Sequence, residues 1–128
     1  MKRKVGLICM GSRENRPNWT DFISLLEPEL DVEMLGVLDD FEFIVEAQGA
    51  LHKSRPEVFA QCMERLGGAD PAACAVCEDA IYAASTAQKA GYYVIGIADP
   101  ASAADEAQMR LVCDQFLPAW SALDWTRA

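Results

Sequence analysis

The chain has 128 residues, of which 52% are hydrophobic and 24% are charged, and its formal net charge is -9 at pH 7. This length suits a single domain, residues 1–128, and this balance is typical of a soluble globular protein, which excludes a disordered or fibrous chain. The acidic charge argues against nucleic acid as a partner, because phosphate backbones are bound by clustered Lys and Arg side chains.

The first half of the chain predicts two strands with a helix between them. Residues 5–10 form a short apolar run that leads into a polar loop, which is typical of a buried parallel strand. Apolar residues spaced three and four apart over residues 19–26 predict a helix that ends near Pro28. Residues 41–45 have the aromatic and β-branched content of a second strand.

The second half continues this alternation of helices and strands. Its expected elements, in chain order, are a helix with Pro56 in its first turn that closes at Gly67 and Gly68, a strand over residues 74–77, an alanine-rich helix over 80–90 capped by Gly91, a strand over 92–97, a helix over 101–110, a short edge strand over 111–116 and a helical turn over 120–125. Strands that alternate with helices at short intervals predict an α/β fold, with a Rossmann-like parallel sheet that carries helices on both faces.

The cysteines and the apolar segments bear on where the protein works. No stretch approaches the roughly 18 apolar residues that span a bilayer, and no signal-peptide pattern is present, so we expect a cytoplasmic protein that does not enter a membrane. The five cysteines are an odd number without a disulfide-scaffold pattern, so we expect reduced thiols. Cys74 and Cys77 fall in a predicted strand, where residues three apart point to opposite faces and cannot bind one ion together. We expect both to be buried structural residues.

Three polar features fall at or beside the carboxyl ends of the predicted strands. These are the loop from Cys9 to Ser12, Lys53 just before a helix, and Glu78 with Asp79 directly after a strand. Taken singly each is weak, since a lysine before a helix is usually solvated and acids after a strand often cap the next helix. Together they are more specific, because loops at the carboxyl ends of strands form the ligand crevice of doubly wound sheets.

Their order resembles that of a known family. Residues 53–59 (KSRPEVF), then 77–79 (CED), then 87–97 (AQKAGYYVIGI) are similar to the second half of the haloacid dehalogenase (HAD) superfamily, and closest to its branch of phosphoglycolate phosphatases and β-phosphoglucomutases. The resemblance extends back to the strand over residues 5–10 and covers roughly residues 5–117. It implies a truncated HAD-like core and a phosphatase that uses magnesium.

The resemblance assigns roles to three residues. Lys53 matches the family lysine that neutralises the phosphate and the aspartyl-phosphate intermediate, a task that suits a compact ammonium. Asp79 matches the carboxylate that holds Mg²⁺ directly or through water, and Glu78 is its usual companion. A carboxylate oxygen suits this ion, which keeps several waters and is completed by the substrate phosphate. We therefore expect Mg²⁺ as cofactor and a phosphorylated small molecule as ligand.

The second family motif is altered. Relatives carry a serine or threonine that donates a hydrogen bond to a phosphate oxygen at the end of the second strand. The aligned position here is Cys9 or Met10, and neither supplies a good hydroxyl donor. Ser12 follows a few residues later, and it serves as the phosphate-binding and catalytic hydroxyl if the loop is tighter than in relatives.

The first family motif is expected to be absent. Relatives open with a strand that ends in Asp-x-Asp, in which one aspartate attacks phosphorus and the other acts as general acid and base. Only residues 1–4 precede the first predicted strand. Asp39 and Asp40 follow an apolar run and offer a relocated motif as an alternative, but solvated loop acids are the simpler interpretation. No cap domain is expected either.

The resemblance leaves a gap in the predicted sheet and three functions open. The family sheet places the missing strand in the middle, so we expect direct closure of the gap, strand exchange in a homodimer, or a partner chain that fills it. The chain is then a phosphohydrolase-type protein with weak or partner-dependent activity, a non-catalytic binding module, or a fragment without independent function. Hydrolysis of an aryl phosphate with and without Mg²⁺ separates these possibilities.

Overall fold

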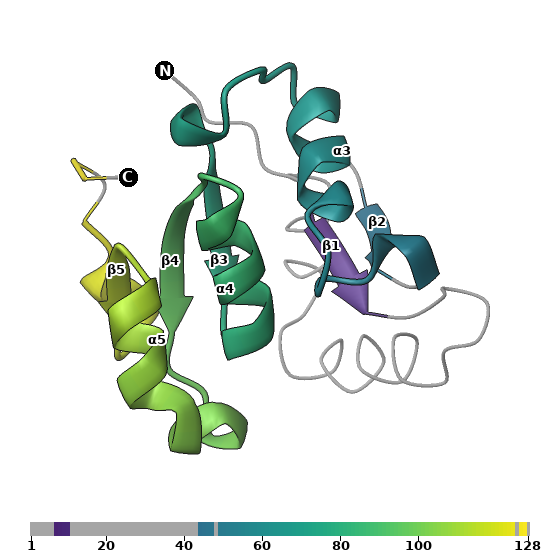
Figure 1. Cartoon of the computed structure of the whole chain (residues 1–128). Helices are drawn as coiled ribbons and strands as arrows, with labels where there is room; N and C mark the ends of the chain where they lie inside the picture. The colour runs from purple at the N-terminus through teal and green to yellow at the C-terminus, as the bar shows by residue number, and fades with distance from the viewer. Residues whose placement is uncertain (1–6, 11–43, 48, 125, 128) are drawn as a thin grey trace, which may run out of the picture. The chain divides into compact units, whose positions relative to one another are not determined.

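The computed structural model describes residues 7–10, 44–47, 49–124 and 126–127, and the chain divides into two compact units, Met1–His52 and Lys53–Ala128 (Figure 1). The helix expected over residues 19–26 lies outside the described residues. The expectation of one domain stays a prediction.

The first unit contains a pair of parallel strands. β1, Leu7–Met10, pairs with β2, Ile44–Ala47. In this register Leu7 lies opposite Ile44 and Met10 lies opposite Ala47. Val45 and Ala47 are buried in β2. A short 3-10 turn, Gly49–Leu51, follows the second strand. Both strands lie in or beside the segments from which the sequence predicted them.

The second unit is a three-stranded parallel sheet with three helices. Its strands are β3, Ala75–Glu78, β4, Tyr93–Ile97, and β5, Gln115–Leu117, in the order β3-β4-β5. Its helices are α3, Glu57–Arg65, α4, Ile81–Lys89, and α5, Glu106–Val112. Helices α4 and α5 lie side by side across the sheet (Figure 1). The three central residues of β4 are all buried, so both faces of the middle strand are covered.

The described elements confirm the predicted α/β class. The strands are parallel and the helices connect them, which makes this a small Rossmann-like fold. No helix in the described part of the chain is long and apolar enough to cross a membrane.

Two glycines end the helices as the sequence predicted. Gly67 follows α3 with φ 81°, and Gly91 follows α4 with φ 94°. The Gly67 and Gly68 N–H groups donate to the carbonyls of Glu64 and Met63. This pair of bonds is the Schellman motif, in which a residue with positive φ lets the next N–H groups fold back onto the last helical turn. The same two bonds recur at the end of α4, from Gly91 and Tyr92.

The last helix and strand start later than expected. Residues 100–105 form a 3-10 helix, and the α-helix proper runs over Glu106–Val112. Leu111 and Val112 therefore end a helix and do not begin a strand, and Leu111 is 87% exposed. The apolar run at 111–116 was misleading because its first member faces solvent.

The expected burial of the cysteine pair is wrong. Cys77 is exposed and Cys74 is half-buried, and both are free thiols, as are Cys62 and Cys113. In β3 the side chains alternate, so Ala75 and Cys77 share an exposed side while Glu78 points into the protein. β3 is therefore buried on one side only, whereas the sequence suggested a strand that is buried on both sides.

Candidate functional site

A nearly buried ion pair lies where β3 ends. The Lys53 Nζ is 2.6 Å from Oε1 of Glu78, and the two side chains are only 13% and 5% exposed. Lys53 comes from the turn before α3, while Glu78 is the last residue of β3. Residues distant in sequence therefore meet at the carboxyl end of the sheet, which is where open α/β folds bind ligands.

The environment of Glu78 opposes its ionisation. Burial raises the pKa of the Glu78 carboxyl above its ordinary value, and the nearby negative charge of Asp79 adds to the rise. The Lys53 ammonium lowers that pKa through its charge and its hydrogen bond, and the Asp79 N–H also lowers it by donating to the carboxylate. A desolvated carboxylate held beside one ammonium depends strongly on that ammonium for its charge.

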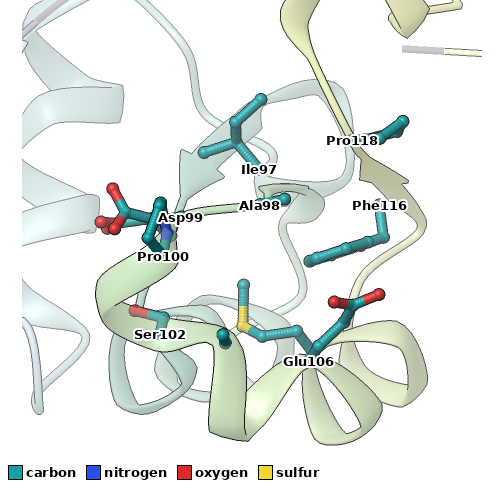
Figure 2. A pocket seen from close by; sticks show the side chains of 11 residues that line it. Ile97, Ala98, Asp99, Pro100, Ser102, Glu106, Phe116 and Pro118 are labelled. Carbon is teal, nitrogen blue, oxygen red and sulfur yellow. The ribbon is translucent and has the colours of Figure 1, made fainter.

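A cavity of about 340 Å³ begins at the next residue, Asp79 (Figure 2). It lies past the carboxyl ends of β4 and β5. The cavity is lined by Asp79, Ile97, Ala98, Asp99, Pro100, Ser102, Ala103, Glu106, Met109, Phe116 and Pro118. Because Glu78 and Asp79 are consecutive, the ion pair and the cavity belong to one end of the sheet.

Two of the lining carboxylates already have partners. The Asp99 side chain accepts a hydrogen bond of 2.7 Å from the Ala101 N–H and so caps the 3-10 helix over Pro100–Asp105. Glu106 accepts two hydrogen bonds from the Arg110 guanidinium, at 3.0 and 2.8 Å. The same guanidinium lies 4.7 Å from the centre of the Phe116 ring. The positive charge of Arg110 is therefore directed to one end of the cavity.

The predicted site residues have different outcomes. Lys53 is brought to Glu78, and Asp79 follows as a lining residue of the cavity. Ser12 lies outside the described residues, as do Asp39 and Asp40.

The predicted metal site is not preformed as a cluster. Among the described residues, no group of three or more His, Cys, Asp or Glu side chains could hold a metal ion. With Glu78 paired to Lys53, Asp79 is the carboxylate left to offer an oxygen. This donor set fits Mg²⁺ only if water and a phosphate complete the coordination, which is the usual way that this ion is bound.

Sequence reasoning missed most of the cavity lining. Asp99 comes two residues after the predicted strand over 92–97, so the rule that assigned Glu78 and Asp79 to the site also points to it. Met109 and Phe116 had no such signal, since an apolar residue in a helix or strand is most often part of the core.

Comparisons with known proteins add no identification: no protein-family model, no curated protein and no solved structure matches this chain.

Proposed function

We propose that this chain is a HAD-like phosphohydrolase-type protein that binds Mg²⁺ and a phosphorylated small molecule, with weak or partner-dependent phosphatase activity. The observation that carries the proposal is the nearly buried pair of Lys53 and Glu78, directly followed in the chain by Asp79, which helps to line a cavity. An ammonium and a carboxylate of this kind offer opposite charges to a phosphate and its metal ion.

Each residue has a definite task in this proposal. A phosphate dianion competes with Glu78 for the Lys53 ammonium, and Lys53 then neutralises charge on the phosphoryl oxygens. Asp79 would supply a carboxylate oxygen to hold Mg²⁺, and the bound ion would supply positive charge for a phosphate. Glu78 keeps Lys53 in place when no phosphate is bound. Ser12 remains the proposed hydroxyl donor to a phosphate oxygen.

The proposal gives β3 a role in completing the sheet. Among the described residues β3 pairs with one strand only, β4. A parallel strand added along the other edge of β3, from a second copy or from a partner chain, would end beside Glu78 and Asp79. If that strand ends in Asp-x-Asp, it brings a nucleophile beside these two residues.

The alternative is a non-catalytic binding or interaction module on the same scaffold. The short distance between Lys53 and Glu78 favours it, because each charge already has a partner and the pair has a purely structural explanation. The two functions differ in whether the pair opens for phosphate. A structural pair stays closed in its presence, and its loss changes stability without changing ligand binding.

Hydrolysis of phenyl phosphate tests the proposal. We expect slow turnover that requires Mg²⁺ and that Lys53→Ala and Asp79→Asn each reduce at least about tenfold, because a charge-assisted hydrogen bond or a metal ligand is worth more than 1.4 kcal/mol. The matched controls are Lys89→Ala, at the end of α4, and Asp105→Asn, which does not line the cavity. Phosphate-monoester hydrolysis needs enhancements of up to about 10²¹-fold, so the turnover stays far below that of an enzyme with a nucleophile.

The assay also separates the alternatives. Turnover that is independent of Mg²⁺, or that falls equally in the variants and in their controls, contradicts the proposal and supports the binding module. Turnover that rises steeply when a second chain with a strand ending in Asp-x-Asp is added supports the partner-dependent form.

A further inference from the structure

We propose that the cavity beyond β4 and β5 binds the alcohol portion of the phosphorylated ligand, and that it accepts apolar groups without a negative charge. This inference rests on the proposed function for the phosphate, which it places at Lys53 and Asp79, and it adds the class of substrate. Asp79 joins the two parts, because it is both the proposed metal ligand and a lining residue of the cavity.

The walls of the cavity are mainly apolar. Seven of its eleven lining residues are apolar, namely Ile97, Ala98, Pro100, Ala103, Met109, Phe116 and Pro118. Phe116 and Pro118 come from β5 and the residue after it, and they lie opposite Pro100 and Ser102 in Figure 2. Small-molecule pockets are typically concave, mostly apolar and furnished with a few polar groups, which is the composition found here.

The cavity is large enough for a small organic group. Its volume of about 340 Å³ lies at the lower end of the range of ligand pockets, roughly 300–1,000 Å³. An apolar cavity of about 150 Å³ already holds benzene. The cavity therefore suits one aromatic ring or a short branched chain.

The charges around the cavity select against anions. Three of its four polar lining residues are carboxylates, Asp79, Asp99 and Glu106, and none of the described lining residues is basic. Arg110 compensates Glu106 and lies against the Phe116 ring, whereas no cation in the described part of the chain forms a salt bridge with Asp79 or Asp99. Mg²⁺ on Asp79 would serve the phosphate, which leaves Asp99 to repel a second anionic group on the ligand. Phosphomonoesters that also carry a carboxylate should thus bind more weakly than uncharged analogues.

Three probes without phosphate test the cavity independently of Lys53. Amide chemical shifts of the full chain are followed during titration with benzyl alcohol, benzylammonium and benzoate. We expect the first two to shift amides of residues 97–103 and 115–117, and benzoate to bind about tenfold more weakly, the scale of one like charge at a partly exposed site. Asp99→Asn keeps an oxygen that can accept the hydrogen bond from the Ala101 N–H. This substitution should narrow the difference in affinity between benzoate and benzyl alcohol several-fold.

A cavity-filling variant supplies the second readout. Ala103→Leu places a larger side chain in the lining and should abolish the shifts caused by benzyl alcohol. Ala104→Leu, on the same 3-10 helix but outside the lining, is the matched control and should leave them unchanged. No shifts with any probe, equal binding of benzoate and benzyl alcohol, or equal effects of the two leucines would overturn the inference.

The two proposals fail separately. Phenyl phosphate should bind more tightly than inorganic phosphate, and this advantage should disappear in Ala103→Leu but persist in Ala104→Leu. If inorganic phosphate binds through Lys53 while the apolar probes do not bind, the proposed function holds and the cavity inference falls. If the probes bind but the affinity for inorganic phosphate is the same in Lys53→Ala as in the wild type, the proposed phosphate site is the part that fails.

Discussion

Lys53→Ala is expected to lower the free energy of unfolding by about 3 kcal/mol at pH 7, because removing one partner of a buried ion pair leaves the other charge uncompensated. The partner left behind is Glu78, whose side chain is 5% exposed. Urea unfolding at pH 7 measures the loss. Lys89→Ala removes an exposed lysine from α4 and should change the stability by less than about 0.5 kcal/mol.

The pH dependence of this variant has a definite sign. The pKa of Glu78 is already raised in the folded protein by burial, and without the Lys53 charge it should rise further. A carboxyl whose pKa is raised on folding binds more protons in the folded state, so its contribution to stability is present below its unfolded pKa of about 4.3 and is lost as pH rises through the folded pKa. Measured at pH 8 and at pH 5, Lys53→Ala should therefore be less destabilised relative to the wild type at the lower pH.

A destabilisation that does not depend on pH would contradict this expectation. If Lys53→Ala is destabilised by the same amount at both pH values, Glu78 does not take up a proton in that window. The Lys53–Glu78 pair would then lack the desolvated character on which the site depends.

Gly96→Ala is expected to destabilise the protein by about 2 kcal/mol, because it overpacks the centre of the sheet. A Cβ at Gly96 would lie 2.7 Å from the Cys113 Sγ, 2.9 Å from a Phe116 ring carbon and 3.1 Å from the end of Met109. Gly96 has an ordinary φ, so the effect comes from crowding and not from backbone strain. Chemical denaturation measures the loss.

Two further measurements identify crowding as the cause. Cys113→Ala removes the nearest atom, so the double variant should be more stable than the sum of the two single effects predicts. Displacement of Phe116 and Met109, which line the cavity, should also weaken the binding of benzyl alcohol. A Gly96→Ala variant as stable as the wild type would mean that the core beside the cavity is loosely packed.

The elements of the second unit were largely predictable from local signals. Gly67 and Gly91 mark helix ends because they occupy a left-handed conformation that most residues avoid, and this preference is visible in the sequence. The end of α5 carries no such glycine, since its C-cap residue is Cys113, which has an extended backbone. The next residue is held by a contact with β4, because the Asp114 carboxylate accepts a hydrogen bond from the Val94 N–H. That contact is tertiary, so sequence patterns could not place the start of β5.

The roles assigned to Lys53, Glu78 and Asp79 stay predictions, but the structure shows how the first two are paired. The sequence associates Lys53 with Asp79, whereas the structure joins Lys53 to Glu78. The reason is alternation along β3, which turns Glu78 into the protein while Asp79 passes beyond the end of the strand. Phe116 and Met109 enter the cavity wall only through the packing of β5 and α5 against β4, which no local pattern encodes.

The most direct measurement is the binding of inorganic phosphate by calorimetry, with and without Mg²⁺, to the wild type, Lys53→Ala, Asp79→Asn and the double variant. We expect Mg²⁺ to strengthen phosphate binding to the wild type and each substitution to weaken it at least about tenfold. The two losses should not be additive, because both residues act on one bound group. Two results would contradict the assignment of Lys53 and Asp79 to a phosphate and metal site. One is that the wild type does not bind phosphate, and the other is that neither Mg²⁺ nor the two substitutions change its affinity for phosphate.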